Sequence, residues 1–366
     1  MISTNSLNDY LYLLEKFVPQ ELIAVEEWAK INRIGKILPS GLTTFFGFES
    51  RLGIAEARGD FLICADAVEA GRRVLAANSY DIDLPDELLN NPVWMNIRKF
   101  STNWESEVSP LYEKVSNVWL EFDVGEEVND LPVPSCFFGA HSLYGTNAAK
   151  SEHPHAWVWD NALHLLLGKR LSASVEDNIV KCFAALPENA YIFQIGLMLA
   201  REWDGVRLCI RNISVDKIIA YLKQINWSGD LDNLQQRLNH ISQFVDRIDL
   251  DIDVSNSIGH KIGLECYLQK QPQFEKRWVD FLDYLVVRGL CLPQKQKALF
   301  QYPGYIQEKM NPGLWPASLR KISHILGSSY EWIIFKGIHH IKLNYCDGEF
   351  QESKAYLYVN RSLIKG

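Results

Sequence analysis

Residues 247–269, RIDLDIDVSNSIGHKIGLECYLQ, alternate between apolar and polar side chains in two runs that a short polar segment separates. A period of two residues is typical of a β-strand that has one apolar and one polar face. The polar face would carry Asp249, Asp251, Asp253, Lys261, Glu265 and Tyr267. The stretch therefore predicts a β-hairpin whose apolar face needs a cover.

Four further segments show the same strand pattern, and helical patterns separate them. The predicted hairpins cover residues 41–66, 118–144, 191–213, 247–269 and 332–359. Apolar residues at helical spacing predict helices at residues 7–17, 19–31, 67–77, 85–100, 158–167, 174–186, 215–225, 231–245, 274–289, 293–300 and 316–326. The chain thus consists of five units of helices followed by a hairpin, a repeat of pattern rather than of letters.

Helices that alternate with antiparallel hairpins cover only one face of the sheet. The polar face then looks at bulk water or at the inside of a closed barrel. Closure is favoured because an open sheet of about ten strands exposes edges that invite aggregation. We expect an α+β fold in one domain, residues 1–366: a closed ten-stranded antiparallel barrel of five αββα repeats with helices outside. Ten strands would leave a lumen wide enough for a small ligand.

The composition limits the partners. A net charge of −8 argues against nucleic acid, because phosphate binding requires a basic surface. The seven cysteines are scattered without a C-x-x-C pair, which is typical of free thiols in a reducing compartment. No run approaches the ~18 apolar residues that span a membrane. We expect a cytoplasmic monomer without a membrane partner.

Five repeats of helices and antiparallel hairpins resemble the ABBA, or PT-barrel, fold of soluble aromatic prenyltransferases. Residues 354–356, KAY, have the K-x-Y spacing with which that family holds an allylic diphosphate. Residues 119–123, WLEFD, are similar to its acidic strand, where a carboxylate orients or deprotonates the aromatic acceptor. The resemblance implies transfer of a prenyl group from an isoprenoid diphosphate to an aromatic or peptide acceptor in the lumen, within specialised natural-product metabolism.

The resemblance also implies roles for individual residues. The expected substrate and diphosphate lining is Arg207, Arg211, Lys261, Tyr267, His340, Lys342, Lys354, Tyr356 and Tyr358. Lys354 and Tyr356 reach the lumen only if the last hairpin contains a bulge or a longer loop than the two-residue turn at Asp347 and Gly348. We expect a five-residue loop, since it leaves an apolar outer face.

Four carboxylates are candidates for catalysis: Glu121, Asp123, Asp249 and Glu265. A symmetric hairpin would place Asp249 opposite Glu265 and Asp253 opposite Lys261. Like charges in opposite positions are destabilising unless a cation, a metal or a shared proton relieves them.

Two interpretations of the acids remain open. In one, Arg207, Arg211 or Lys342 neutralises them in a cross-strand ladder. In the other, Asp249 and Glu265 form an acid/base dyad, and the barrel is a diphosphate-independent cyclase. A third hypothesis is a non-catalytic barrel that binds a small molecule or a peptide.

The sequence indicates no certain cofactor and one candidate metal site. No cofactor motif occurs in the chain. Glu121 and Asp123 would suit Mg²⁺, which prefers oxygen ligands. His153 and His155 match no zinc spacing, so we expect no metal there. His339 and His340 are expected on opposite faces of their strand, with His340 in the lumen as a possible proton donor.

Overall fold

The computed structural model describes residues 6–68, 70–79, 82–125, 131–201 and 203–365. The strands are β1 (Phe45–Arg51), β2 (Gly59–Asp66), β3 (Val115–Phe122), β4 (Ser135–Tyr144), β5 (Tyr191–Leu197), β6 (Val206–Arg211), β7 (Arg247–Val254), β8 (Ile258–Tyr267), β9 (Gly304–Gln307), β10 (Tyr330–Cys346) and β11 (Glu349–Lys365). The α-helices are α1 (Asn8–Leu14), α2 (Val25–Ile37), α3 (Ala70–Leu75), α4 (Asp86–Leu89), α5 (Pro92–Glu105), α6 (His164–Leu167), α7 (Ala173–Ala184), α8 (Val215–Gln224), α9 (Leu231–Ile241), α10 (Arg277–Val287), α11 (Pro293–Gln301) and α12 (Ala317–Leu326). Short 3-10 turns lie at Glu15–Phe17, Ser40–Leu42 and Lys150–Glu152, and a π-helical turn, Val158–Leu163, precedes α6.

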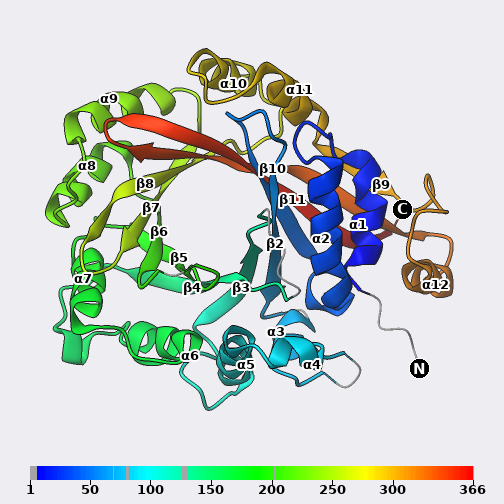
Figure 1. The fold of residues 1–366 in the computed structure, drawn as a ribbon, viewed down its shortest axis with the longest axis horizontal. Coiled ribbons are helices and arrows are strands. Elements are labelled where there is room, and N and C mark those ends of the chain that lie inside the picture. Colours follow the sequence, from blue (N-terminus) through cyan, green and yellow to red (C-terminus); the bar gives the residue numbers. More distant parts are fainter. Residues whose placement is uncertain (1–5, 69, 80–81, 126–130, 202, 366) are drawn as a thin grey trace.

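The strands form a closed antiparallel barrel with the helices outside it (Figure 1). Each strand of a hairpin pairs with its partner, neighbouring hairpins pair in chain order, and β11 closes the ring by pairing with both β1 and β10. The five predicted hairpins and the ten-stranded barrel are confirmed. Strand β9, which the sequence did not predict, pairs only with the first half of β10, outside the ring.

Strand β7 is buried on both of its faces. Its apolar residues, such as Leu250 and Ile252, are fully buried in the core between barrel and helices. Asp249 and Asp251 point to the other side and are also buried, with 0% and 2% of their surface exposed. A strand whose polar face is buried lies in a closed barrel, because an open sheet would leave that face in water.

Several helix predictions differ from the structure in their bounds, and the segment predicted as one helix at residues 85–100 forms α4 and α5. The second helix begins at Val25, six residues after Pro19, since the intervening segment forms turns.

Asp230 caps α9 as a helix N-cap should, by accepting a hydrogen bond from the backbone N–H of Asn233 at 3.0 Å. Among the described residues, every helix is too short or too polar to cross a bilayer.

The β7–β8 hairpin has nearly the predicted register. Asp249 lies opposite Glu265, as predicted. The prediction that Asp253 faces Lys261 is wrong, because a register shift between Ile252 and Val254 displaces Asp253. Asp253 instead lies opposite Arg207 of the neighbouring strand β6.

The last hairpin turns in two residues, so the predicted five-residue loop is wrong. Asp347 and Gly348 both have positive φ, 52° and 83°, the conformation of tight hairpin turns. A register shift between Asn344 and Tyr345 then moves the pairing by one residue. This bulge places Lys354 opposite Lys342 and turns both side chains into the barrel, so the predicted inward face is confirmed by a different route.

Candidate functional site

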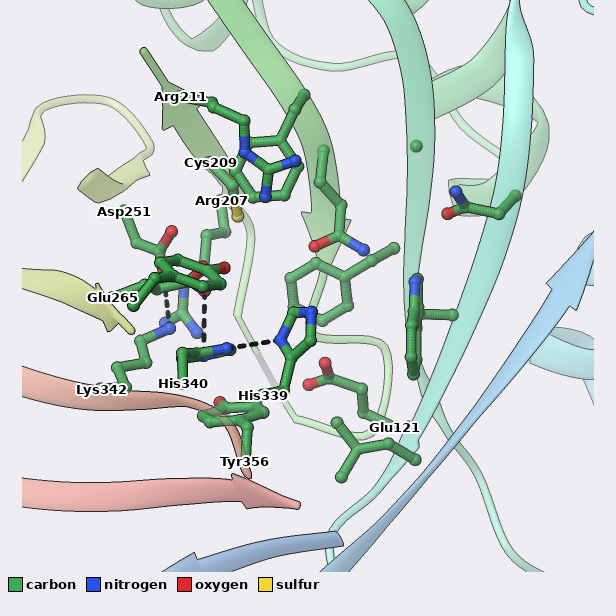
Figure 2. Close-up of a pocket in the computed structure, with 18 residues that line it drawn as sticks. Glu121, Arg207, Cys209, Arg211, Asp251, Glu265, His339, His340, Lys342 and Tyr356 are labelled. Carbon is green, nitrogen blue, oxygen red and sulfur yellow. Dashed lines mark hydrogen bonds and ion pairs between the residues drawn. The ribbon is translucent and has the colours of Figure 1, made fainter. Parts of the chain in front are cut away.

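The lumen contains two adjoining cavities. The larger, about 230 Å³, is here called the aromatic compartment; it is lined by Leu62, Asn117, Trp119, Glu121, Phe137, Gly139, Phe193, Gln194, Arg207, Cys209, Arg211, Asp251, Glu265, Tyr267, His339, His340, Lys342 and Tyr356 (Figure 2). The smaller, about 70 Å³, is the polar compartment; it is lined by Glu49, Asp60, Leu62, Glu121, Asp123, Ser135, Met198, Arg201, Arg207, Lys261, Lys342, Asn344, Lys354 and Tyr356. Both have Leu62, Glu121, Arg207, Lys342 and Tyr356 in their walls.

The structure brings most of the predicted site residues together. The aromatic compartment collects Glu121, Arg207, Arg211, Glu265, Tyr267, His340, Lys342 and Tyr356. The polar compartment adds Asp123, Lys261 and Lys354. Asp249 lines neither cavity because it is buried in an ion pair, and Tyr358 lies beside Phe45, with 6.0 Å between ring centroids.

Three lumen cations, Arg207, Arg211 and Lys342, are paired with aspartates of β7. Arg207 binds Asp253 through two hydrogen bonds, Nε to Oδ1 at 2.8 Å and Nη2 to Oδ2 at 3.1 Å. Arg211 Nε donates to Asp249 Oδ2 at 2.9 Å, and Lys342 donates to Asp251. The interpretation of a neutralising cross-strand ladder is confirmed. It explains how Asp249 tolerates Glu265 in the opposite position.

Gly263 gives Lys342 its route to Asp251. The two residues lie on β10 and β7, which β8 separates. Gly263 of β8 stands opposite Asp251, and a Cβ there would lie 2.6 Å from Cε of Lys342. The missing side chain therefore opens the space through which the lysine crosses the intervening strand.

Two acids in the polar compartment were not predicted. Glu49 on β1 pairs with Lys354 Nζ at 2.7 Å and accepts a hydrogen bond from the Tyr356 hydroxyl. Asp60 on β2 pairs with Arg51 Nη2 at 3.1 Å, and burial followed by repulsion from Glu49 raises its pKa to about 7. Alternation in FFGFESR, residues 45–51, carries the signal for Glu49, but the neighbouring glycines and alanines obscured which face points inward.

Glu121 stands in the wall between the two compartments. Its carboxyl group makes no hydrogen bond or ion pair with any other residue that the structure describes. Burial, and then the charge of Glu49, raise its pKa to about 8, although Lys342 and Arg207 act in the opposite direction. At neutral pH the group is therefore mostly a neutral acid that can donate a hydrogen bond.

Asp123 does not share the environment of Glu121. Both of its carboxylate oxygens accept hydrogen bonds from Arg201, Nε at 2.8 Å and Nη2 at 2.7 Å. A divalent cation at Glu121 and Asp123 would have to displace this guanidinium, so the arrangement does not fit Mg²⁺. In the described ranges, no group of three or more His, Cys, Asp or Glu residues is arranged to hold a metal.

Both histidines of the last hairpin face the aromatic compartment, so the prediction of opposite faces is wrong. A register shift between Ile338 and His340 is the cause, since the extra residue turns His339 inward as well. His340 stacks on Tyr356 with 4.2 Å between ring centroids, and its Nδ1 lies 2.8 Å from Nδ1 of His339. Desolvation by the lumen walls lowers the pKa of both imidazoles, although His340 is buried and His339 is accessible.

Apolar side chains complete the aromatic compartment. Phe137 and Cys209 belong to a small hydrophobic cluster inside the barrel, against which Trp119 and Phe193 pack. Burial raises the pKa of the Cys209 thiol well above its ordinary value, so the group is a protonated thiol rather than a nucleophilic thiolate. The compartment thus offers flat apolar walls with ionisable groups between them.

Comparison with known proteins identifies the fold. No protein-family model and no curated protein matches the chain. The solved structure of a 6-dimethylallyl tryptophan synthase superimposes over 98% of this chain and 96% of its own, with 12% sequence identity and a TM-score of 0.51. AnaPT from Neosartorya fischeri covers 99% of this chain and 93% of its own, with 11% identity and a TM-score of 0.46. The chain has the PT-barrel fold, as its sequence predicted.

Proposed function

We propose that the protein transfers a prenyl group from an isoprenoid diphosphate to an aromatic or peptide acceptor bound in the lumen. The observation that carries this proposal is the position of Glu121. Its carboxyl group, without a partner in the described chain, stands between a cavity with aromatic walls and a smaller cavity whose lining includes both lysines and acids. The similarity of the fold to a 6-dimethylallyl tryptophan synthase supports the same classes of donor and acceptor.

The reaction divides between the compartments. In the polar compartment the C–O bond of the donor breaks, and the diphosphate leaves with the electron pair. Lys261, which forms no ion pair with the described residues, and Lys354 would stabilise its growing charge. In the aromatic compartment Glu121 would hold the acceptor by a hydrogen bond, and the faces of Tyr267 and Tyr356 would stabilise the prenyl cation.

The test measures donor binding and product together. We expect dimethylallyl or geranyl diphosphate to raise the melting temperature and, with an aromatic acceptor such as tryptophan, to give a prenylated product and free diphosphate. Glu121→Ala should lower turnover about 100-fold, as the loss of a positioned polar group does. Lys261→Ala should weaken the effect of the diphosphate, whereas Lys217→Ala, on the outer surface of α8, should not.

One combination of results would contradict the proposal. If neither diphosphate changes the melting temperature and no acceptor is prenylated, the lumen does not serve this reaction.

A second candidate is an acid/base conversion that needs no diphosphate. The observation in its favour is that Arg207, Arg211, Lys342 and Lys354 are already paired with carboxylates. A diphosphate would have to compete with these acids for its cations. An aromatic ligand that binds by calorimetry and is converted without any diphosphate, in a manner lost in Glu121→Ala, would support this candidate over prenyl transfer.

A further inference from the structure

Three side chains form a chain of contacts from the cavity into the barrel wall. His339 Nδ1 lies 2.8 Å from His340 Nδ1, and His340 Nε2 lies 3.6 Å from Oε1 of Glu265 (Figure 2). The other oxygen of Glu265 accepts a hydrogen bond from the Tyr267 hydroxyl at 2.6 Å. The carboxylate is thereby anchored on one side and faces the imidazole on the other.

The protonation pattern follows from these contacts. Nε2 of His340 is buried and forms no hydrogen bond with the described residues. The negative charge of the Glu265 carboxylate, 3.6 Å away, favours a proton on this nitrogen. In a neutral imidazole the other nitrogen then accepts, and His340 Nδ1 takes its hydrogen bond from Nδ1–H of His339. His339 is left with an unprotonated Nε2.

The position of His339 makes that nitrogen available to a ligand. His339 is accessible in the lumen, and Figure 2 shows its ring in the cavity beside His340, to which a dashed line joins one ring nitrogen. Within the described chain Nε2 of His339 has no hydrogen-bond partner. We propose that His339 is the general base of the lumen, and that His340 and Glu265 are positioning residues that hold it in the reactive tautomer.

The step can be written for the proposed function, on which this inference rests for the identity of the proton donor. After the prenyl carbon bonds to the acceptor ring, a ring C–H bond breaks and its electron pair restores aromaticity. The proton goes to Nε2 of His339, which becomes an imidazolium while its Nδ1–H still donates to His340. The proton passes to water when the product leaves.

The surrounding charges divide into two groups. Glu265 on β8, and Glu121 on β3 when it is ionised, favour the imidazolium form. Arg211 on β6, Arg247 on β7 and Lys342 on β10 oppose it. The Tyr267 and Tyr356 hydroxyls stay neutral, because burial raises the pKa of both well above the ordinary value. Glu121 as neutral acid and His339 as neutral base then form a complementary pair in one cavity.

The first measurement does not depend on turnover. In the full-length protein with ¹⁵N-labelled histidine, long-range ¹H–¹⁵N spectra at pH 7.5 should show His339 protonated at Nδ1 and unprotonated at Nε2. His339→Gln assigns the signals, and His260→Gln, on the exposed side of β8, serves as control. In Glu265→Gln the preference for this tautomer should be lost. A proton on Nε2 of His339 in the unaltered protein overturns the proposal.

The second measurement uses kinetics. His339→Gln should lower kcat about 100-fold or more with a much smaller change in KM, and His260→Gln should leave both unchanged. Glu265→Gln should move the acid limb of the pH profile to lower pH, because the carboxylate raises the pKa of His339. Full turnover in His339→Gln overturns the proposal. If the unaltered protein forms no product, the proposed function fails while the spectra still decide the tautomer.

Discussion

Glu121 lies in an environment that disfavours the ionised form of its side chain. Its carboxyl group is enclosed in the barrel without a partner in the described chain, and burial raises its pKa from 4.5 to about 8. Structural acids in the same lumen, such as Asp251 and Asp253, have a cation in contact. A neutral carboxylic acid that is kept available in a cavity is typical of a functional position rather than of a structural one.

The raised pKa predicts a pH-dependent stability difference. Between pH 4.5 and about 8 the folded protein holds more protons on Glu121 than the unfolded chain does. The contribution of this residue to the free energy of unfolding therefore falls as the pH rises through that window. We expect Glu121→Gln to be more stable than the unaltered protein at pH 9, on the order of a few kcal/mol, and equally stable near pH 4.5.

Urea denaturation at a series of pH values measures this difference. Glu352→Gln is a suitable control, since Glu352 is partly exposed and paired with Arg51. A gain in the free energy of unfolding of Glu121→Gln that does not depend on pH would contradict the assignment of a protonated Glu121.

At the scale of the element, three ion pairs join β7 to other strands of the described chain, and they differ in burial. Asp251 and Lys342 have 2% and 7% of their side-chain surfaces exposed. Asp253 and Arg207 are more accessible, with 27% and 23% exposed. Breaking a buried pair leaves an uncompensated charge in a medium of low dielectric constant, whereas water can solvate the remaining partner of an accessible pair.

Asp251→Asn should therefore cost more than Asp253→Asn. We expect losses of about 3–5 kcal/mol and about 1 kcal/mol, measured by urea denaturation at pH 8, above the pKa of about 6 to which burial raises Asp251. Adding Lys342→Met to Asp251→Asn should restore more than half of the loss, because it removes the stranded charge. Equal losses at the two positions would show that Lys342 reaches water.

At the scale of the whole molecule, β11 completes the barrel. It pairs with β1 over Lys354–Asn360 and with β10 along its whole length. Without it, both neighbours would become sheet edges, and the lumen with its buried acids would open to water. Beyond Asn360, β11 continues its pairing with β10, and one further backbone hydrogen bond, from Arg361 N–H to the carbonyl oxygen of Thr44 at 3.0 Å, joins it to the segment before β1.

This arrangement predicts different effects for two truncations. Removal of residues 349–366 should abolish the cooperative thermal transition in scanning calorimetry, because the ring can no longer close. Removal of residues 361–366 should lower the melting temperature but leave a single transition. A cooperative transition in the longer truncation would mean that the remaining strands form a stable sheet without closure.

The sequence by itself determined the strand faces and the closed barrel. Alternation is a local property with a period of two residues, so RIDLDIDV shows its inward acids without any partner. The same alternation identified Glu121 and Lys342 as lumen residues, and closure followed from the need to protect the edges of a sheet of about ten strands. Neutralisation of the aspartates by cations was one of the two interpretations that the local pattern left open.

Only the tertiary structure decided the bulges and the partners. A shift of one residue reverses the face of every side chain beyond it, and neither shift in β10 has a marker in the letters around His339 or Asn344. Partners depend on strands that are distant in sequence: Lys342 reaches Asp251 across 91 positions, and Tyr356 reaches Glu49 across 307. The contacts from Glu265 through His340 to His339 depend on both a bulge and a distant partner. The bulge in β10 turns His339 inward, and the neighbouring strand β8 supplies Glu265, which orients His340.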